Sequence, residues 1–197
     1  EANEAIGVLS HGGDDKVVRA DQSHTMIEQL KTFHKDFVYH EEPGQGHWWD
    51  LSDEPGADCV DWAPMFDFFA RHALPADKAV REVNFVTVNP GISASSHWVT
   101  VEDQLEHLKL SSVAIRIDPG QRRFVGRTEN IARLSLKLNV LPGSNPFSIQ
   151  LDGQTLQDIA YPSEQKQTWL TRETGQWRVT DAPSKSMKGP HRFGPFK

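Results

Sequence analysis

The pattern of apolar and polar residues divides the chain into two parts of different character. In the first part, a continuous apolar run from Ala5 to Leu9 predicts a strand that is covered on both faces. Apolar residues at helical spacing over residues 21–33 predict a helix, and residues 36–40 predict a second strand. A loop rich in turn residues follows, and residues 59–72 predict a further helix with a proline in its early part.

Short strand signals dominate after a polar linker near Asp77. Most of them are separated by turn dipeptides such as Pro-Gly and Asp-Gly, which favours an antiparallel, sandwich-like or barrel-like sheet. Arg122, Arg123 and Arg127 are expected at an exposed hairpin end. The predicted strands are 83–88, 97–102, 113–117, 132–138, 148–151, 168–172 and 177–180.

The predicted fold class is therefore α/β followed by all-β, with domains over residues 1–76 and 77–197. Two parallel strands with two helices cannot cover their own apolar faces. We therefore expect exposed apolar residues near Ile6, Val8 and Phe37. We also expect the first domain to pack on the second, on another copy of the chain, or on a partner. Both ends of the sequence suggest a piece of a longer polypeptide.

Composition narrows the classes of protein. The 197 residues carry a net charge of -6 with scattered basic residues, so a nucleic-acid partner is not expected. No apolar run is long enough to span a membrane. Cys59 is the only cysteine, which excludes an intrachain disulfide but leaves the compartment open. The first residues do not have the pattern of a signal peptide, which is expected to be absent or to have been removed before this chain begins, and export is expected if the parent protein had one.

Two loops that follow the predicted parallel strands each carry a candidate for chemistry. Asp14 lies in a glycine-rich loop after the first strand, and His47 lies in a second glycine-rich loop after the second strand. The carboxyl ends of parallel strands gather at one sheet edge, so a carboxylate there could hold an imidazole in one tautomer and stabilise its protonated form. Trp48 and Trp49 could wall a substrate pocket or pack beneath the loop.

Other combinations of these residues are less favoured. Asp14, Asp15, His47 and Asp50 could be drawn together as metal ligands, but they have no recognisable ligand spacing, so no metal is expected. No cofactor motif is present, and no cofactor is expected. Taken singly, an aspartate in a glycine-rich turn or a histidine in a loop is usually structural.

The segments VLSHGGDDKVV and DFVYHEEPGQGHWWD, each followed by a predicted helix, resemble the end of the α/β-hydrolase domain in the prolyl oligopeptidase family. The resemblance covers residues 5 to 75 and implies that Asp14 is the triad acid and His47 the base, with Asp15 as a neighbour. The family usually has His-Gly where this chain has Ser10-His11, which leaves the register between Asp14 and Asp15 open. Residues 80–197 resemble the region that follows this domain in large, uncharacterised bacterial proteins.

The nucleophile of such a triad is absent from the sequence. No Gly-x-Ser-x-Gly motif is present, and Gly91-Ile92-Ser93-Ala94-Ser95 lacks the second glycine and follows the histidine. The resemblance therefore implies a fragment or subunit of a serine peptidase or esterase, inactive alone, whose serine comes from an upstream segment or another chain. The alternative is a non-catalytic binding or assembly module that retains a structural remnant. Trp98, Trp169 and Trp177 could then form a carbohydrate-stacking face, although core packing is favoured.

Overall fold

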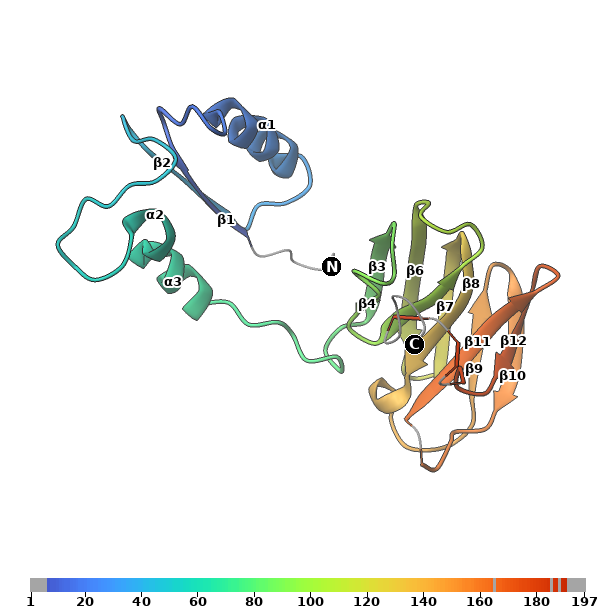
Figure 1. The fold of residues 1–197 in the computed structure, drawn as a ribbon. Helices are drawn as coiled ribbons and strands as arrows, with labels where there is room; N and C mark the ends of the chain where they lie inside the picture. Colours follow the sequence, from blue (N-terminus) through green and yellow to red (C-terminus); the bar gives the residue numbers. More distant parts are fainter. Residues whose placement is uncertain (1–6, 165, 185, 188, 191–197) are drawn as a thin grey trace. The chain divides into compact units, whose positions relative to one another are not determined.

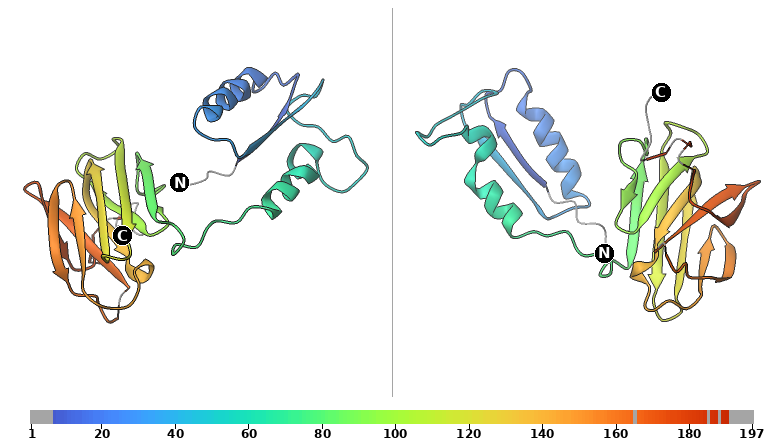
Figure 2. Two further views of the ribbon diagram at one scale, coloured as in Figure 1. Left: turned by 180° about the vertical axis from the view of Figure 1, so that it is seen from behind. Right: turned by 60° about the horizontal axis from the view of Figure 1, so that its bottom comes forward.

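The computed structural model describes residues 7–164, 166–184, 186–187 and 189–190. The chain forms two compact units that divide between Leu74 and Pro75, two residues before the sequence-based boundary. Figures 1 and 2 show a small unit with helices and a larger unit made of strands. No helix among the described residues is long and apolar enough to cross a bilayer.

The first unit is built on two parallel strands, β1 (Gly7–Gly12) and β2 (Phe37–Glu42), in register from Gly7 opposite Phe37 to Gly12 opposite Glu42. Helix α1 (Ala20–Lys31) connects them, and α2 (Asp58–Asp61) and α3 (Ala63–Ala70) follow. α1 lies on one face of the strand pair and α2 and α3 on the other (Figures 1 and 2). β1 runs three residues past the predicted end at Leu9, so Ser10 and His11 belong to the strand rather than the loop.

The single helix predicted over residues 59–72 is wrong, because the chain breaks at Trp62 into α2 and α3. Trp62 has the extended ψ of 112°, and Pro64 follows within the first turn of α3. A proline has no amide hydrogen, its ring collides with the carbonyl four residues earlier, and it biases the residue before it away from the helical region. Pro64 is therefore accommodated only by starting a new helix, where its missing donor costs little.

The second unit is a β-sandwich-like pair of sheets, as the alternating patterns after Asp77 predict. One sheet has the order β10-β9-β7-β6-β3 and the other β12-β11-β8-β5-β4. Every strand pairing is antiparallel except that of β7 with β9. The strands are β3 (Glu82–Thr87), β4 (Ser95–Ser96), β5 (Val99–Gln104), β6 (Ser111–Asp118), β7 (Arg123–Glu129), β8 (Ile131–Lys137), β9 (Phe147–Leu151), β10 (Gln154–Ile159), β11 (Gln167–Glu173) and β12 (Gln176–Thr180), with a 3-10 turn over Leu138–Val140.

The core of the sandwich forms because alternate residues of each strand point between the sheets. Val113, Ile115 and Ile117 on β6 are at most 5% exposed, and β9 follows the same alternation. Trp98 and Trp177 are also in this core, 0% and 1% exposed, so the three-tryptophan stacking face is wrong for these two residues. Large aromatic side chains contribute most to a small core, which explains their burial.

Three strands were missed from the sequence: β4, which has only two residues, β7 and β10. β7 contains Arg123 and Arg127, two of the three arginines that were expected at a solvated hairpin end, and β10 is a polar edge strand with a register irregularity. Arg122 also differs from the expectation: its guanidinium donates to the carbonyl oxygens of Asn145 and Pro146 and lies over the ring of Tyr161. Charged residues mask strand periodicity when only their long stems are covered.

Candidate functional site

The two loops after β1 and β2 meet in the first unit, and backbone hydrogen bonds hold them together. The amide of Gly13 donates to the carbonyl of Glu42 at 2.9 Å, and the amide of Asp14 donates to the carbonyl of Gln45 at 2.8 Å. A Cβ atom on Gly12 would lie 2.0 Å from the carbonyl oxygen of Gly46. Only glycine permits this approach, so Gly12 sets the distance between the loops.

The acid that the structure brings to His47 is Asp15, not Asp14. His47 Nδ1 donates to Asp15 Oδ2 at 2.8 Å. The Asp14 side chain is exposed and makes no hydrogen bond with a described residue, since its backbone is used to join the loops. The prediction of Asp14 as the partner of His47 is therefore corrected by one residue, within the register that the sequence left open.

Asp15 is held in one orientation by the backbone that follows it. Its Oδ1 accepts hydrogen bonds from the amides of Val17 at 2.7 Å and Val18 at 3.0 Å, which leaves Oδ2 for the imidazole. The Asp15 side chain is only 4% exposed. Burial alone would raise the pKa of the Asp15 carboxyl, but the hydrogen bonds from His47, Val18 and Val17 outweigh it and lower the pKa below its ordinary value. Asp15 is therefore a carboxylate at neutral pH.

His47 has one nitrogen occupied and one available. A carboxylate only accepts, so the bond to Asp15 places the proton on Nδ1, and Nε2 carries the lone pair. The imidazole is 39% exposed, and no described residue forms a hydrogen bond with Nε2. The geometry therefore combines a buried, fixed carboxylate with an accessible proton acceptor.

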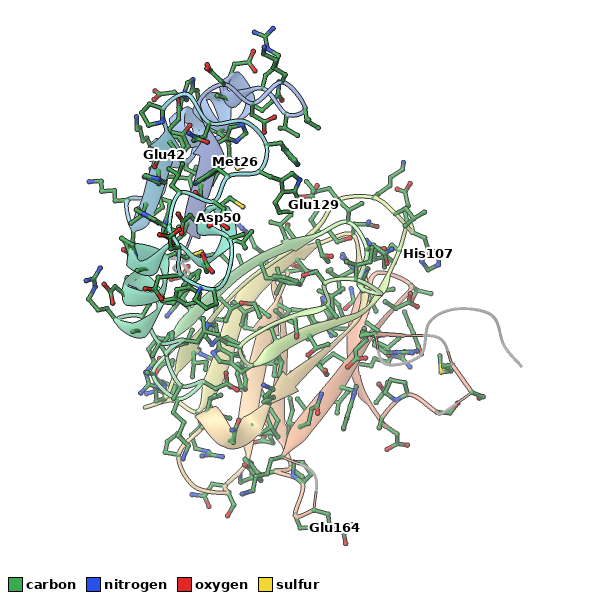
Figure 3. The ribbon with its side chains drawn as sticks, turned by 60° about the vertical axis from the view of Figure 1, so that its left-hand side comes forward. Met26, Glu42, Asp50, His107, Glu129 and Glu164 are labelled. Carbon is green, nitrogen blue, oxygen red and sulfur yellow. The ribbon has the colours of Figure 1, made fainter. Side chains whose placement is uncertain are left out.

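Three other histidines of this unit pair with carboxylates, and they differ from His47 in the atom used. His24 reaches Glu41, His40 reaches Glu42 and His72 reaches Asp36, and all three use Nε2. His72 Nδ1 also bonds to the carbonyl of Phe68, and this bond, followed by that to Asp36, raises the pKa of His72 despite its burial. These pairs use the nitrogen that His47 leaves free. The His24 and His72 pairs join segments that are far apart in the sequence, whereas His40 and Glu42 both lie on β2. Glu42, at the end of β2, is labelled in Figure 3 with Asp50 of the following loop.

His11 was not singled out from the sequence, and it supports the loop that carries Asp15. Its Nε2 donates to the carbonyl of Val18 at 2.8 Å, and its Nδ1 accepts from the hydroxyl of Ser23 at 2.8 Å. Its Nε2 also lies 3.6 Å from Asp15 Oδ2. The signal that could have revealed this role is its position at the end of an apolar strand, where a histidine is buried and requires partners on both nitrogens.

The two tryptophans that follow His47 have different surroundings. Trp48 is 72% exposed, and its ring meets the His47 ring edge-on with centroids 5.6 Å apart. Trp49 is 7% exposed and lines a cavity of about 480 Å³ whose walls include Trp62 and Glu42 but neither His47 nor Asp15. Trp48 is thus the one of the two that is placed beside the imidazole.

In the described part of the chain, neither a metal site nor a nucleophile accompanies the pair of Asp15 and His47. Among the described residues, no group of three or more histidine, cysteine, aspartate or glutamate side chains is arranged to hold a metal ion. That finding speaks against a site built from Asp14, Asp15, His47 and Asp50. Within the same residues, no serine, threonine or cysteine forms a hydrogen bond with His47.

Comparisons with known proteins give no relative for this chain: no family model, curated protein or solved structure matches it. The resemblance to the prolyl oligopeptidase family, and with it the resemblance of residues 80–197 to bacterial proteins of that type, is therefore wrong. The described part of the chain is mostly β-sheet, and the described residues of the first unit form two strands, which do not define a hydrolase domain. The site must be argued from its own geometry.

Proposed function

We propose that Asp15 and His47 form the proton-transfer half of a hydrolytic site that cleaves a peptide or ester bond. The observation that carries the proposal is the combination of a buried carboxylate on His47 Nδ1 with a free, accessible Nε2. Nε2 would accept the proton of an attacking hydroxyl, and Asp15 would stabilise the imidazolium that forms. The same proton would then pass to the leaving group, which returns His47 to its starting state.

The nucleophile is proposed to lie outside the described residues, on an upstream segment or another chain. Support comes from the incomplete character of the first unit, since two parallel strands with half-buried side chains are normally part of a wider sheet covered on both faces. Additional strands beside β1 or β2 would place further loops at the edge where Asp15 and His47 meet.

The experiment uses the longest natural polypeptide that contains this chain, with p-nitrophenyl acetate as substrate and a fluorophosphonate as a serine-reactive probe. We expect Asp15→Asn to lower kcat on the order of 10⁴-fold, because the imidazolium loses the carboxylate that stabilises it. We expect His47→Gln to lower kcat on the order of 10⁴- to 10⁶-fold, because the group that transfers the proton is gone. His24→Gln is the matched control, since His24 also bonds to a carboxylate but through Nε2. Hydrolysis and probe labelling that survive both variants would refute the proposal.

The second candidate function is a binding module. It is favoured by the well-packed sandwich, whose core is independent of the Asp15–His47 pair. A chain that shows no His47-dependent hydrolysis in any context, but retains specific ligand binding by residues 75–197, would support this candidate instead.

A further inference from the structure

An open pocket lies on the outer face of the β12-β11-β8-β5-β4 sheet, in the second unit. Its volume is about 430 Å³, within the range of small-molecule sites. It is formed where the end of β8, the 3-10 turn and the start of β11 come together. The lining residues are Lys137, Asn139, Lys166, Gln167 and Trp169. The β10–β11 connection that precedes Lys166 includes Glu164, which projects from the sandwich in Figure 3.

Trp169 is the flat wall of this pocket. Thr168 and Leu170, its neighbours on β11, are 6% and 0% exposed, so the alternation of a strand turns Trp169 to the outer face. Trp169 is half-buried there, whereas Trp98 and Trp177 are enclosed in the core. An indole on a sheet surface offers an apolar face to a ligand that brings its own polar edges.

A buried polar chain fixes the orientation of Gln167 in the wall. Gln167 Nε2 donates to the hydroxyl of Ser135 at 2.7 Å, and that hydroxyl donates to Glu102 Oε1 at 2.6 Å. Ser135 is 1% exposed and Glu102 9%. Ser135 and Glu102 lie on the same face of the sheet as Trp169, and burying a carboxylate there is costly, since apolar side chains would pack more favourably. The series of hydrogen bonds through Ser135 to Glu102 instead holds the Gln167 amide in one orientation. Its Oε1, to which no described residue donates, is therefore available as an acceptor.

The charge of the pocket is opposite to that of the whole chain. The chain has a net charge of -6, but the lining contains two lysines and no carboxylate. Lys137 Nζ is paired with Asp77 at 2.9 Å. Lys166 forms no ion pair with any described residue, so its ammonium group is available to an anionic ligand.

From these features, we propose that the pocket binds a saccharide that carries a carboxylate. The sugar ring stacks on Trp169, its hydroxyl groups bond to Gln167 Oε1 and the Asn139 amide, and its carboxylate pairs with Lys166. An apolar face flanked by side-chain amides, one of them held in orientation by Ser135, suits a pyranose ring, and the unpaired lysine selects an acidic one. The proposal is independent of the hydrolytic site, because it concerns residues of the other unit only.

The test measures binding of three oligomeric uronates, from polygalacturonate, alginate and hyaluronan, to the full chain by calorimetry and by the indole NMR signal of Trp169. At least one uronate should bind and shift that signal. If oligogalacturonate binds, its methyl ester should bind at least about tenfold more weakly, since the ester keeps the sugar ring and loses the charge. Lys166→Gln should cause a similar loss for any uronate that binds, and Trp169→Ala a loss of about tenfold or more.

Matched controls separate the pocket from general effects. Trp48→Ala removes an exposed tryptophan of the other unit, and Lys109→Gln removes an exposed lysine elsewhere on the sandwich, so both should bind as the parent does. Thermal unfolding checks that each variant is folded. If Trp169→Ala does not fold, Lys166→Gln still tests the pocket. Failure of all three uronates to bind, or binding that Lys166→Gln and Trp169→Ala leave unchanged, would overturn the proposal.

Discussion

At the residue scale, the central feature is that His47 bonds to Asp15 and not to the neighbouring Asp14. The sequence predicted that His47 pairs with an aspartate of the loop after the first strand, but composition could not separate the two neighbouring aspartates. The structural difference is that Asp15 has backbone amides two and three residues ahead of it, those of Val17 and Val18, which satisfy Oδ1. An aspartate before a turn often bonds forward in this way, but Asp14 has equivalent amides ahead of it, so the sequence alone does not separate the two.

The lowered pKa of Asp15 predicts a specific response to acid. A carboxyl whose pKa is lowered by folding stabilises the folded state above its unfolded pKa, about 3.9, and this contribution is lost as the pH falls through the lower folded value. The free energy of unfolding of the first unit should therefore be higher in the parent than in Asp15→Asn above about pH 5, and the difference should shrink on acidification.

The measurement is chemical denaturation at several pH values, with hydrogen exchange of residues 7–74 as the probe of unfolding. Asp14→Asn is the matched control, because the Asp14 side chain is exposed and has no hydrogen bond with a described residue. A difference between the parent and Asp15→Asn that grows towards low pH, or an equal effect of Asp14→Asn, would contradict the assignment.

At the element scale, the pattern of apolar residues located the elements but not all of their ends. The alternating segments after Asp77 predicted the strands with a clear inward face, such as β6 and β9, because burial of every second residue leaves a direct trace in the sequence. β10 left no such trace, and the break before α3 depended on the position of Pro64 within the turn. The close approach of the loops after β1 and β2 also depends on one residue, Gly12.

A methyl group on Gly12 should separate those loops. Gly12→Ala would place Cβ 2.0 Å from the carbonyl oxygen of Gly46, so the backbone must move and the bond between Asp15 and His47 should weaken. The expected loss in stability of the first unit is about 1–3 kcal/mol. Gly46→Ala is the control in the same loops, because a Cβ there meets nothing within 4 Å. Equal thermal stability of the two variants would argue against a fixed distance between the loops.

At the scale of the whole molecule, the two units differ in how much apolar surface they enclose. Nineteen buried apolar residues form the core of the sandwich, whereas the buried apolar residues described in the first unit are Ile27, Trp49 and Phe68. Exposed apolar residues are frequent in the first unit, including Val17, Phe33 and Leu74, each at least 74% exposed. The sequence predicted exposed apolar residues in this unit, but near Ile6, Val8 and Phe37. Val8 and Phe37 are half-buried, and Ile6 lies outside the described residues.

The imbalance predicts two unfolding transitions. Since burial of apolar surface supplies most of the stability, the first unit should lose hydrogen-exchange protection at a lower denaturant concentration than the sandwich. Ile115→Ala, at a fully buried position, should destabilise the sandwich by about 2–5 kcal/mol and leave the first transition unchanged. Ile92→Ala is the control, since Ile92 is 87% exposed. A single transition shared by both units would contradict this account.

The account depends most on the protonation of one imidazole. Nitrogen-15 NMR of His47, recorded where the ring is neutral, reports which nitrogen carries the proton. We expect the proton on Nδ1 in the parent, and a shift of the population towards Nε2–H in Asp15→Asn, because the carboxylate that selects the tautomer is gone. A proton on Nε2 in the parent, or an unchanged spectrum in the variant, would show that Asp15 does not hold His47 ready to accept a proton.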